Sequence, residues 1–530
     1  MQKNLSLIVK ANQDFIRHTG DDQKKNAPVL NLLYESISSV YIPLIRMVEN
    51  LEKDGIKARI GLVLPPVLCN LLSDEIIQES YLEWLDKRNQ LGLKELERNK
   101  GNDQVVKLIQ KTIDTNNLNQ KDFVEKYNKN LITVFSDLMK KGVIELLGTT
   151  GTDIYMPHYA DMKEIISAQI ESGLHAYRQF FGIVPEGFWL PEFGYTPGIE
   201  KLIKAYGYTY TILDPRSVLL AEKVPESGIF YPSRTENSLV VFTRCKNVEE
   251  ELYGEEGFIY NCSYRNQNRD IGYELSMDQL APIMNEGEVR YSTGYMYWNR
   301  CFDEEKSLVY NEAEAQEQLK KDAETFVNNR KVVLEKAAEL LKDKPFVASV
   351  CTFEADKFCK VWHESIEWLE EVIKVAVKND LTVTTCDQMC DDQFNLERIT
   401  PYYSAGIGAG YGENLLSSKN CWMMRYIRKS CERMIDLADR FPSDTGLKNR
   451  LLNLGAKELM LAQSCNIAKN IDRSEYPEFA ERRFKESIVA FTAVFDSLGS
   501  NVVSTEWLTT LEARDSIFPW MNYRIFSKKR

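Results

Sequence analysis

The sequence contains very little histidine. Four of its 530 residues are histidine, and no two of them are close in sequence: His18, His158, His175 and His363. Histidine is the commonest protein ligand for metals and the most frequent general base. This scarcity argues against a metal site built from histidine. It also excludes a metal-dependent sugar deacetylase, which needs an aspartate and two histidines.

Three further absences narrow the class of protein. The net charge of −12 leaves no basic excess for binding nucleic acid. No run of about 18 apolar residues predicts a membrane span, and the first apolar run ends at Lys10, too early for a signal peptide. The eleven cysteines are an odd number, and only Cys386 and Cys390 form a close pair. We therefore expect reduced thiols in a cytoplasmic protein that binds neither nucleic acid nor membrane.

What the sequence does contain is a regular alternation of short apolar runs and helical patterns. This βα rhythm is typical of a parallel sheet or barrel. The length is compatible with about three or four domains, or with one large α/β barrel and an appendage. The candidate strands are Leu5–Val9, Ile60–Leu64, Val143–Leu147, Gly187–Leu190, Tyr208–Leu213, Leu239–Phe242, Phe346–Thr352 and Thr382–Thr385.

The chain also divides into regions of different character. Residues 71–139 are polar and helical and predict an insertion after the second strand. Residues 245–270 have no clean period and predict a long ordered loop over a site. Residues 401–530 predict helices without strands, whereas residues 1–400 carry the βα pattern. The predicted helices are 161–180, 197–206, 311–342 (one helix or a pair), 422–441, 447–470, 478–498 and 504–514.

Carboxylates follow two of the predicted strands. In a βα barrel the working residues lie at the C-terminal ends of the strands. Glu192 follows the strand that begins at Gly187, and Glu354 and Asp356 follow the strand that begins at Phe346. A retaining glycosidase needs two carboxyl groups about 5–5.5 Å apart, one as nucleophile and one as acid/base. Aromatic residues make up 11% of the chain, which fits a carbohydrate cleft or an aromatic-rich core.

Two stretches carry a family resemblance. GFWLPEFGYTPGIE, which contains Glu192, and LEARDSIFPWMNYRIF (511–526) resemble glycoside hydrolase family 57, and within it the 1,4-α-glucan branching enzyme group. Weaker matches are VKANQDFIRH, IELLGTTGTDIYMP, RDIGYEL, STGYMYW, and KELMLAQS followed by ERRFKESI. Together the matches run almost from end to end of the chain.

The resemblance implies a (β/α)7 TIM-like barrel, a C-terminal all-helical domain and a retaining mechanism without metal or cofactor. It makes Glu192 the nucleophile that forms a glucosyl-enzyme, and Glu354 the acid/base by alignment, with Asp356 as the alternative. Transfer to the O6 hydroxyl of another glucan gives a branch, and transfer to water gives hydrolysis. The implied partner is an α-glucan such as glycogen, amylose or a maltooligosaccharide.

Departures from the family pattern cluster at this predicted site. Lys10 and Asn12 stand where the family has two histidines, Asp153 where it has another, and Lys360 where it has a fourth. The order of the two carboxylates at 354 and 356 is reversed. Family tryptophans align with Gly406, Gly412 and Leu415, and an Asp-Trp pair aligns with Asn466-Ile467. The candidate substrate-binding residues are Asn12, Asp153, Trp189, Phe258 (in place of a tyrosine associated with branching), Lys360, Trp362 and Asn466.

Three functional hypotheses follow. The first is an active α-glucan transglycosidase or hydrolase that uses Glu192 with Glu354 or Asp356. The second is a non-catalytic relative that binds glucan or a protein partner, and the third is an enzyme of changed specificity. The sequence makes no prediction about the oligomeric state.

Overall fold

The fold is known from a computed structural model. It describes residues 1–529 apart from 17–25, 282, 285–288, 302–307 and 391–392. His18 lies outside the described residues.

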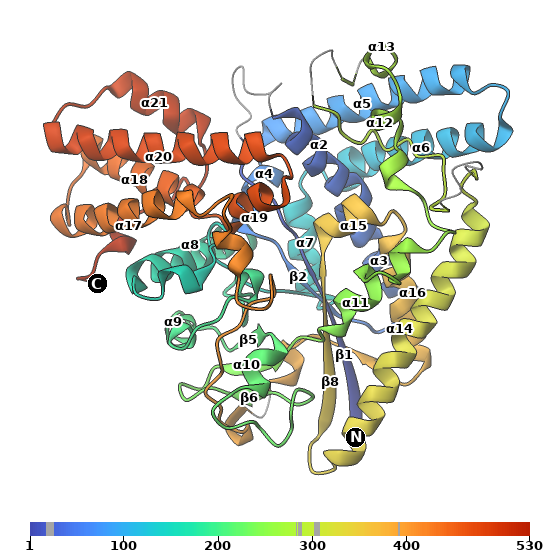
Figure 1. Cartoon of the computed structure of the whole chain (residues 1–530), viewed down its shortest axis with the longest axis horizontal. Coiled ribbons are helices and arrows are strands. Elements are labelled where there is room, and N and C mark those ends of the chain that lie inside the picture. Colours follow the sequence, from blue (N-terminus) through green and yellow to red (C-terminus); the bar gives the residue numbers. More distant parts are fainter. Residues whose placement is uncertain (17–25, 282, 285–288, 302–307, 391–392, 530) are drawn as a thin grey trace.

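Seven parallel strands of the described chain close into a ring (Figure 1). One sheet has the order β3-β2-β1-β8 and the other contains β4-β5-β7. Parallel bridges from Gly148 to Phe188 and from Arg244 to Val350 join the two sheets on either side. The strands are β1 (Gln2–Lys10), β2 (Ile60–Val63), β3 (Ile144–Leu146), β4 (Gly187–Phe188), β5 (Tyr210–Leu213), β7 (Val240–Thr243) and β8 (Phe346–Glu354). The predicted (β/α)7 barrel is thus confirmed.

Two short strands lie outside this ring. β9 (Thr382–Val383), also predicted from the sequence, pairs with the N-terminal half of β1. β6 (Ser233–Arg234) pairs antiparallel with β7 and was not predicted, because two residues are too short to show a period. The eight predicted strands are all present.

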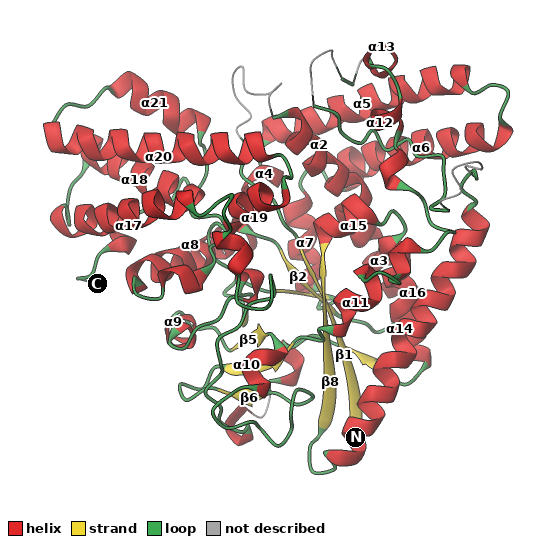
Figure 2. Ribbon diagram, in the orientation of Figure 1, coloured by secondary structure: helices red, strands yellow, loops and turns green. Residues whose placement is uncertain are grey.

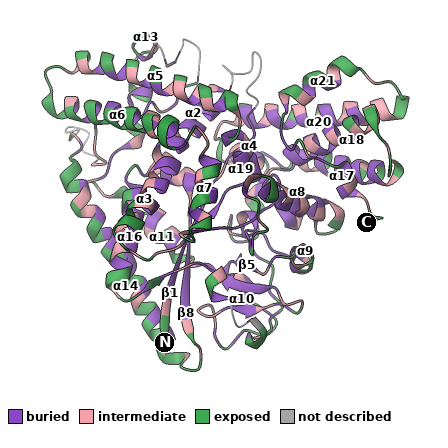
Figure 3. Cartoon of the chain, turned by 180° about the vertical axis from the view of Figure 1, so that it is seen from behind, coloured by how far each residue is buried: buried purple, intermediate pink, exposed green. Residues whose placement is uncertain are grey.

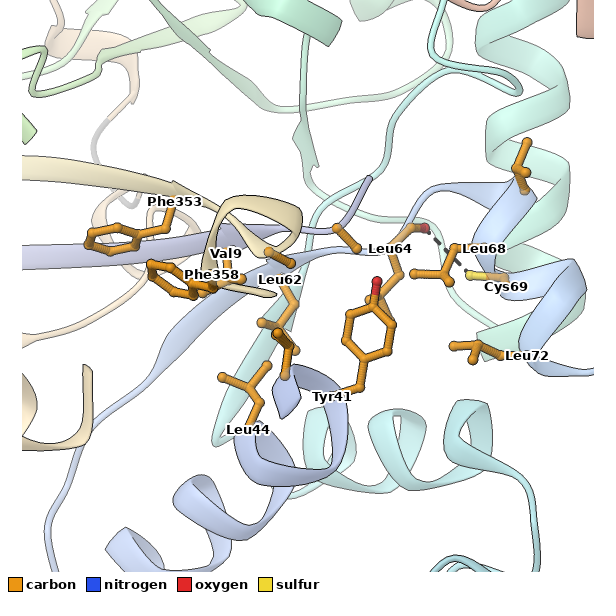
Figure 4. Close-up of a cluster of buried hydrophobic side chains, with 14 of the residues drawn as sticks. Val9, Tyr41, Leu44, Leu62, Leu64, Leu68, Cys69, Leu72, Phe353 and Phe358 are labelled. Atoms are coloured by element: carbon orange, nitrogen blue, oxygen red, sulfur yellow. Dashed lines mark hydrogen bonds between the residues drawn. The ribbon is translucent and has the colours of Figure 1, made fainter. Parts of the chain in front are cut away.

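The alternation of side chains along each strand builds two cores. On β1, Ile8 points into the barrel, where it packs with Val63 and Val350. Its neighbour Val9 points outward to the helices, where Leu62 and Tyr41 also lie (Figure 4). Because successive side chains of a strand face opposite sides, a strand buried on both faces is apolar at nearly every position.

The helices surround the ring and extend it at the top (Figures 1 and 2). Between β2 and β3 lie α4 (Pro66–Leu72), α5 (Glu75–Arg98), α6 (Asp103–Lys121) and α7 (Leu131–Lys140). The long charged pattern at 311–342 is one helix, α14 (Glu312–Leu340). The other longer helices before residue 400 are α2 (Ala27–Ser36), α3 (Ile42–Lys53), α8 (Lys163–Phe181), α9 (Ile199–Ala205), α15 (Ala355–Val361) and α16 (Ser365–Lys378).

The continuous helical run over Ala27–Lys53 is long and apolar enough to cross a membrane by length and composition. However, 78% of its most apolar window is buried inside the fold. Figure 3 shows the same segment largely in the colour of buried residues. This run is therefore a core helix.

Two sequence predictions need correction. The loop predicted at 245–270 begins with a helix, α11 (Asn247–Tyr253), which the aromatic-rich pattern concealed. The predicted helix 447–470 is two helices, α18 (Gly446–Ala462) and α19 (Cys465–Arg473). The chain turns at Ser464, whose backbone is non-helical (φ −55°, ψ 123°). The remaining C-terminal helices are α17 (Trp422–Arg440), α20 (Pro477–Ser500) and α21 (Thr505–Arg514).

Candidate active site

The candidate site lies at the C-terminal ends of the strands. Lys10 is the last residue of β1 and Glu354 the last of β8, and the two are paired in register. Parallel strands end at the same edge, so this pairing brings the two side chains to one rim of the barrel. The stretch VKANQDFIRH and the carboxylates at 354 and 356 therefore meet in space although they are more than three hundred residues apart in the chain.

Glu192 follows β4 in a 3-10 turn, Pro191–Phe193, with an uncommon backbone conformation. Its φ of 53° and ψ of 23° lie in the left-handed region, which costs a non-glycine residue on the order of 1–3 kcal/mol. The amide of Gly406 donates a hydrogen bond of 2.6 Å to the Glu192 carbonyl. A side chain at Gly406 would come within 2.7 Å of the Phe193 ring. Strained backbone that its surroundings hold in place is common at functional sites.

The Glu192 carboxylate forms a buried ion pair with Lys469. The Lys469 Nζ lies 2.5 Å from Glu192 Oε1, and the two side chains are 5% and 10% exposed. Although burial by itself lowers the pKa of Lys469, the nearby Glu192, Cys465 and Glu354 raise it well above its ordinary value. Lys469 is thus a fixed cation beside the predicted nucleophile. Lys469 could not be predicted from the sequence, because no motif marks it and the break before α19 sets the direction of its side chain.

A second buried ion pair joins Lys10 to Asp153. Lys10 Nζ lies 3.2 Å from Asp153 Oδ2, and both side chains are at most 5% exposed. Burial lowers the pKa of Lys10, but the charges of Asp153 and Glu192 outweigh this and raise it. Two of the four positions at which the family has histidines therefore hold opposite charges that pair with each other.

Glu354 is an ionised carboxylate. Its nearest cation is Lys357, whose Nζ lies 3.4 Å from Glu354 Oε2. Burial by itself raises the pKa of Glu354, but Lys357, Lys469, Lys10 and Arg473 lower it to about 2. A group with this pKa carries almost no proton near neutral pH, whereas a general acid must be protonated in the ground state.

Asp356 has a different environment on the first turn of α15. Its closest cation is Lys360, 3.8 Å away, and Lys360 pairs more closely with Glu475, at 2.8 Å. Asp356 Oδ1 is buried and has no hydrogen-bond partner in the described chain. Asp356 thus has fewer charged neighbours within 4 Å than a carboxylate held in a close ion pair, and one of its oxygens is open to a ligand.

Helix α19 and the turn after it contact the loops that carry these residues. Besides the Lys469–Glu192 pair, Asn470 donates a hydrogen bond of 2.8 Å to Asp14. The Cys465 amide donates one of 3.0 Å to the Asp153 carbonyl, and Glu475 follows α19 to meet Lys360. In Figure 1, α19 lies between the C-terminal helices and the strands. The C-terminal region therefore covers the strand ends with charged and polar side chains.

The other predicted binding residues differ in their surroundings. Asn12 and Asn466 each have a buried side-chain oxygen without a hydrogen-bond partner in the described chain, as a ligand-facing amide would. Trp189 is 3% exposed and packs on Phe193 inside the barrel. Phe258 is half-buried against the outer core.

Trp362 has no exposed surface and packs between Tyr264 and Trp368. It is therefore a core residue, and we do not retain the expectation that it stacks on sugar.

A large cavity adjoins this cluster. It has a volume of about 960 Å³, and Lys360 and Glu475 are among its lining residues. Its walls carry amides and hydroxyls together with aromatic rings, among them Asn31, Asn116, Asn268, Tyr273 and Tyr476. Cavities of this size and mixed lining bind ligands of several rings, with apolar faces for stacking and a few polar groups for orientation.

Comparison with known proteins places the chain in a family. Residues 6–347 match the family model described as glycosyl hydrolase family 57, and residues 426–526 match 1,4-alpha-glucan branching enzyme, C-terminal. A 1,4-alpha-glucan branching enzyme of Thermococcus kodakarensis is 23% identical over 524 residues, which cover 92% of this chain and 73% of that enzyme.

Solved structures agree with this match. The alpha-amylase AmyC of Thermotoga maritima superposes with a TM-score of 0.90 at 25% identity, covering 99% of both chains. A family 57-type branching enzyme of Pyrococcus horikoshii superposes with a TM-score of 0.88 at 20% identity, covering 100% of this chain and 98% of that one. The chain belongs to glycosyl hydrolase family 57.

Proposed function

We propose that this protein is an α-glucan-acting retaining transglycosidase or hydrolase that works through a glycosyl-enzyme on Glu192. The observation that carries the proposal is the convergence of two carboxylates on one cation. Glu192 contacts Lys469 at 2.5 Å, and the charges of both Glu192 and Glu354 act on that same buried ammonium. Two carboxyl groups gathered from different strands at one rim are what double displacement at an anomeric carbon requires.

In the first step, the free oxygen of Glu192 attacks the anomeric carbon and the glucan leaving oxygen takes a proton. We assign this proton to Asp356, because Glu354 is ionised at neutral pH. In the second step the acceptor hydroxyl loses its proton as it attacks the glycosyl-enzyme. Glu354, already a carboxylate, can accept that proton and release it to solvent, while Asp356 takes up a proton from solvent before the next turnover. The two carboxyls at the end of β8 thus divide a role that one residue fills in a standard retaining mechanism.

The large cavity suits a glucan chain as the ligand. Its amides can bond sugar hydroxyls, and its tyrosines offer faces for the apolar side of a glucose ring. Lys360 and Glu475 line it and pair with each other, and Lys360 also lies 3.8 Å from Asp356. We propose that glycogen, amylose or a maltooligosaccharide occupies this cavity, with Asn12, Asp153 and Asn466 bonding the sugar held at the nucleophile.

We also propose a division of labour along the chain. Residues 1–400 form the catalytic barrel, with the helical insertion at about 71–139 and the loop at about 245–270, where Phe258 faces the acceptor. Residues 401–530 form the helical domain that completes the site through α19. The reaction needs no cofactor, and the eleven free cysteines fit a cytoplasmic location.

The test is incubation of the purified chain with amylose and with maltooligosaccharides. We expect either new reducing ends or new α-1,6 linkages revealed by debranching, and neither from Glu192→Gln. Glu481→Gln, which neutralises an exposed glutamate on α20, is the matched control and should keep full activity. Folded wild-type protein that binds maltooligosaccharide without changing it would instead establish a glucan-binding relative.

A further inference from the structure

Lys469 is the one cation within 4 Å of the Glu192 carboxylate in the described part of the chain. It comes from the C-terminal helical region, 277 residues further along the chain than Glu192. The contact involves Oε1 of Glu192, and within the described residues Oε2 has no hydrogen bond or ion pair. We propose that Lys469 is a positioning residue, which fixes one oxygen of the nucleophile so that the other faces the anomeric carbon. This inference rests on the proposed function.

The geometry around Lys469 favours positioning over general charge balance. Its helix is anchored on both sides of it, by the Cys465 amide on the Asp153 carbonyl and by Asn470 on Asp14. Ordering the side chain of a lysine on an exposed helix costs conformational entropy. Lys469 is buried, so packing has already fixed its aliphatic chain. The ammonium therefore holds Glu192 in one orientation, within the tolerance that attack at a carbon atom needs.

Lys10, the other buried lysine at this rim in the described chain, is already bound to Asp153, with 3.2 Å between Nζ and Oδ2. It cannot replace Lys469 beside the nucleophile.

The test compares Lys469→Met, which keeps the length and removes the charge, with Lys469→Arg, which keeps the charge. The readout is the rate at which a 5-fluoro-glucosyl fluoride labels Glu192, followed by mass spectrometry. We expect Lys469→Met to label about 100-fold more slowly, as for a misplacement of about 1 Å. Lys469→Arg, which keeps a cation beside Oε1, should recover part of the rate, whereas a merely structural role of the side chain would not be rescued by charge.

The matched control is Lys485→Met, which removes an exposed lysine of α20 and should label like wild type. If Lys469→Met is not folded, Lys469→Gln takes its place with the same expected slowing, because its side chain is shorter and neutral and no longer holds Oε1. Labelling by the neutral variant at the wild-type rate overturns the proposal. Faster labelling overturns it too, since Lys469 would then obstruct the site. No labelling of the wild type refutes the proposed function, and this inference falls with it.

Discussion

The ionised state of Glu354 leads to a prediction about how the two carboxyls at the end of β8 share the work. Although burial raises the pKa of Glu354, Lys357 and the other nearby cations lower it to about 2, so the group is almost entirely deprotonated near neutral pH. A general acid must carry a proton before the reaction, and Glu354 is therefore poorly suited to that role. We therefore expect Glu354 to act as a base and Asp356 to act as the acid.

The perturbations are Glu354→Gln and Asp356→Asn, each measured on two donors. A maltooligosaccharide has a leaving group that needs a proton, and a maltosyl fluoride has one that does not. Asp356→Asn should slow glycosylation by the oligosaccharide about 100-fold or more and leave the fluoride nearly unchanged. Glu354→Gln should spare glycosylation by both donors and slow transfer to a hydroxyl acceptor, and added azide should restore turnover because it needs no base.

The opposite pattern would refute the reasoning. If Glu354→Gln slows the oligosaccharide about 100-fold while sparing the fluoride, and Asp356→Asn does not, then Glu354 is the acid. In that case the lysines around it, Lys357 first among them, do not hold it ionised when substrate is bound.

Three further predictions concern stability. Lys10→Met leaves Asp153 buried without a partner, so the free energy of unfolding should fall by about 3–5 kcal/mol in denaturant titrations, and an unchanged midpoint would contradict the ion pair. Burial, and then Arg428, lower the pKa of His158 to about 4, so its neutral form supplies stability that is present above pH 6.5 and lost as pH falls toward 4. Between pH 6.5 and 4, the free energy of unfolding of His158→Gln should fall by up to about 3 kcal/mol less than that of wild type. The same pH profile of unfolding for both proteins would count against this role of His158. Gly406→Ala should lower the midpoint of thermal unfolding, at a cost of about 1–3 kcal/mol, because its Cβ would meet the Phe193 ring, and a midpoint equal to that of wild type would show that the turn has room.

The sequence predicted the barrel well because its strands are short apolar runs buried on both faces. Such runs are visible without knowing what they pack against, and so the strand containing Ile8 and Val9 was found within a few residues of its true ends. The break at Ser464 was not predicted, because the apolar spacing of α18 continues into α19 and only tertiary contacts turn the chain there.

The candidate site was predicted in part. Glu192, Glu354 and Asp356 could be found because they follow strands, and strand ends converge in any barrel. Lys469 could not, since its role depends on where a helix from the other end of the chain comes to lie. The prediction for Trp362 was wrong. Its position shortly after Glu354 and Asp356 suggested that it binds substrate, but the structure buries it completely.

If Glu192 forms the glycosyl-enzyme, that covalent intermediate can be trapped. The wild-type chain is incubated with a 5-fluoro-glucosyl fluoride, digested with a protease and sequenced by tandem mass spectrometry. We expect a glycosyl adduct on the peptide that contains Glu192, absent from Glu192→Gln and suppressed by excess maltooligosaccharide. An adduct on another carboxylate, or folded protein that carries none, would contradict it.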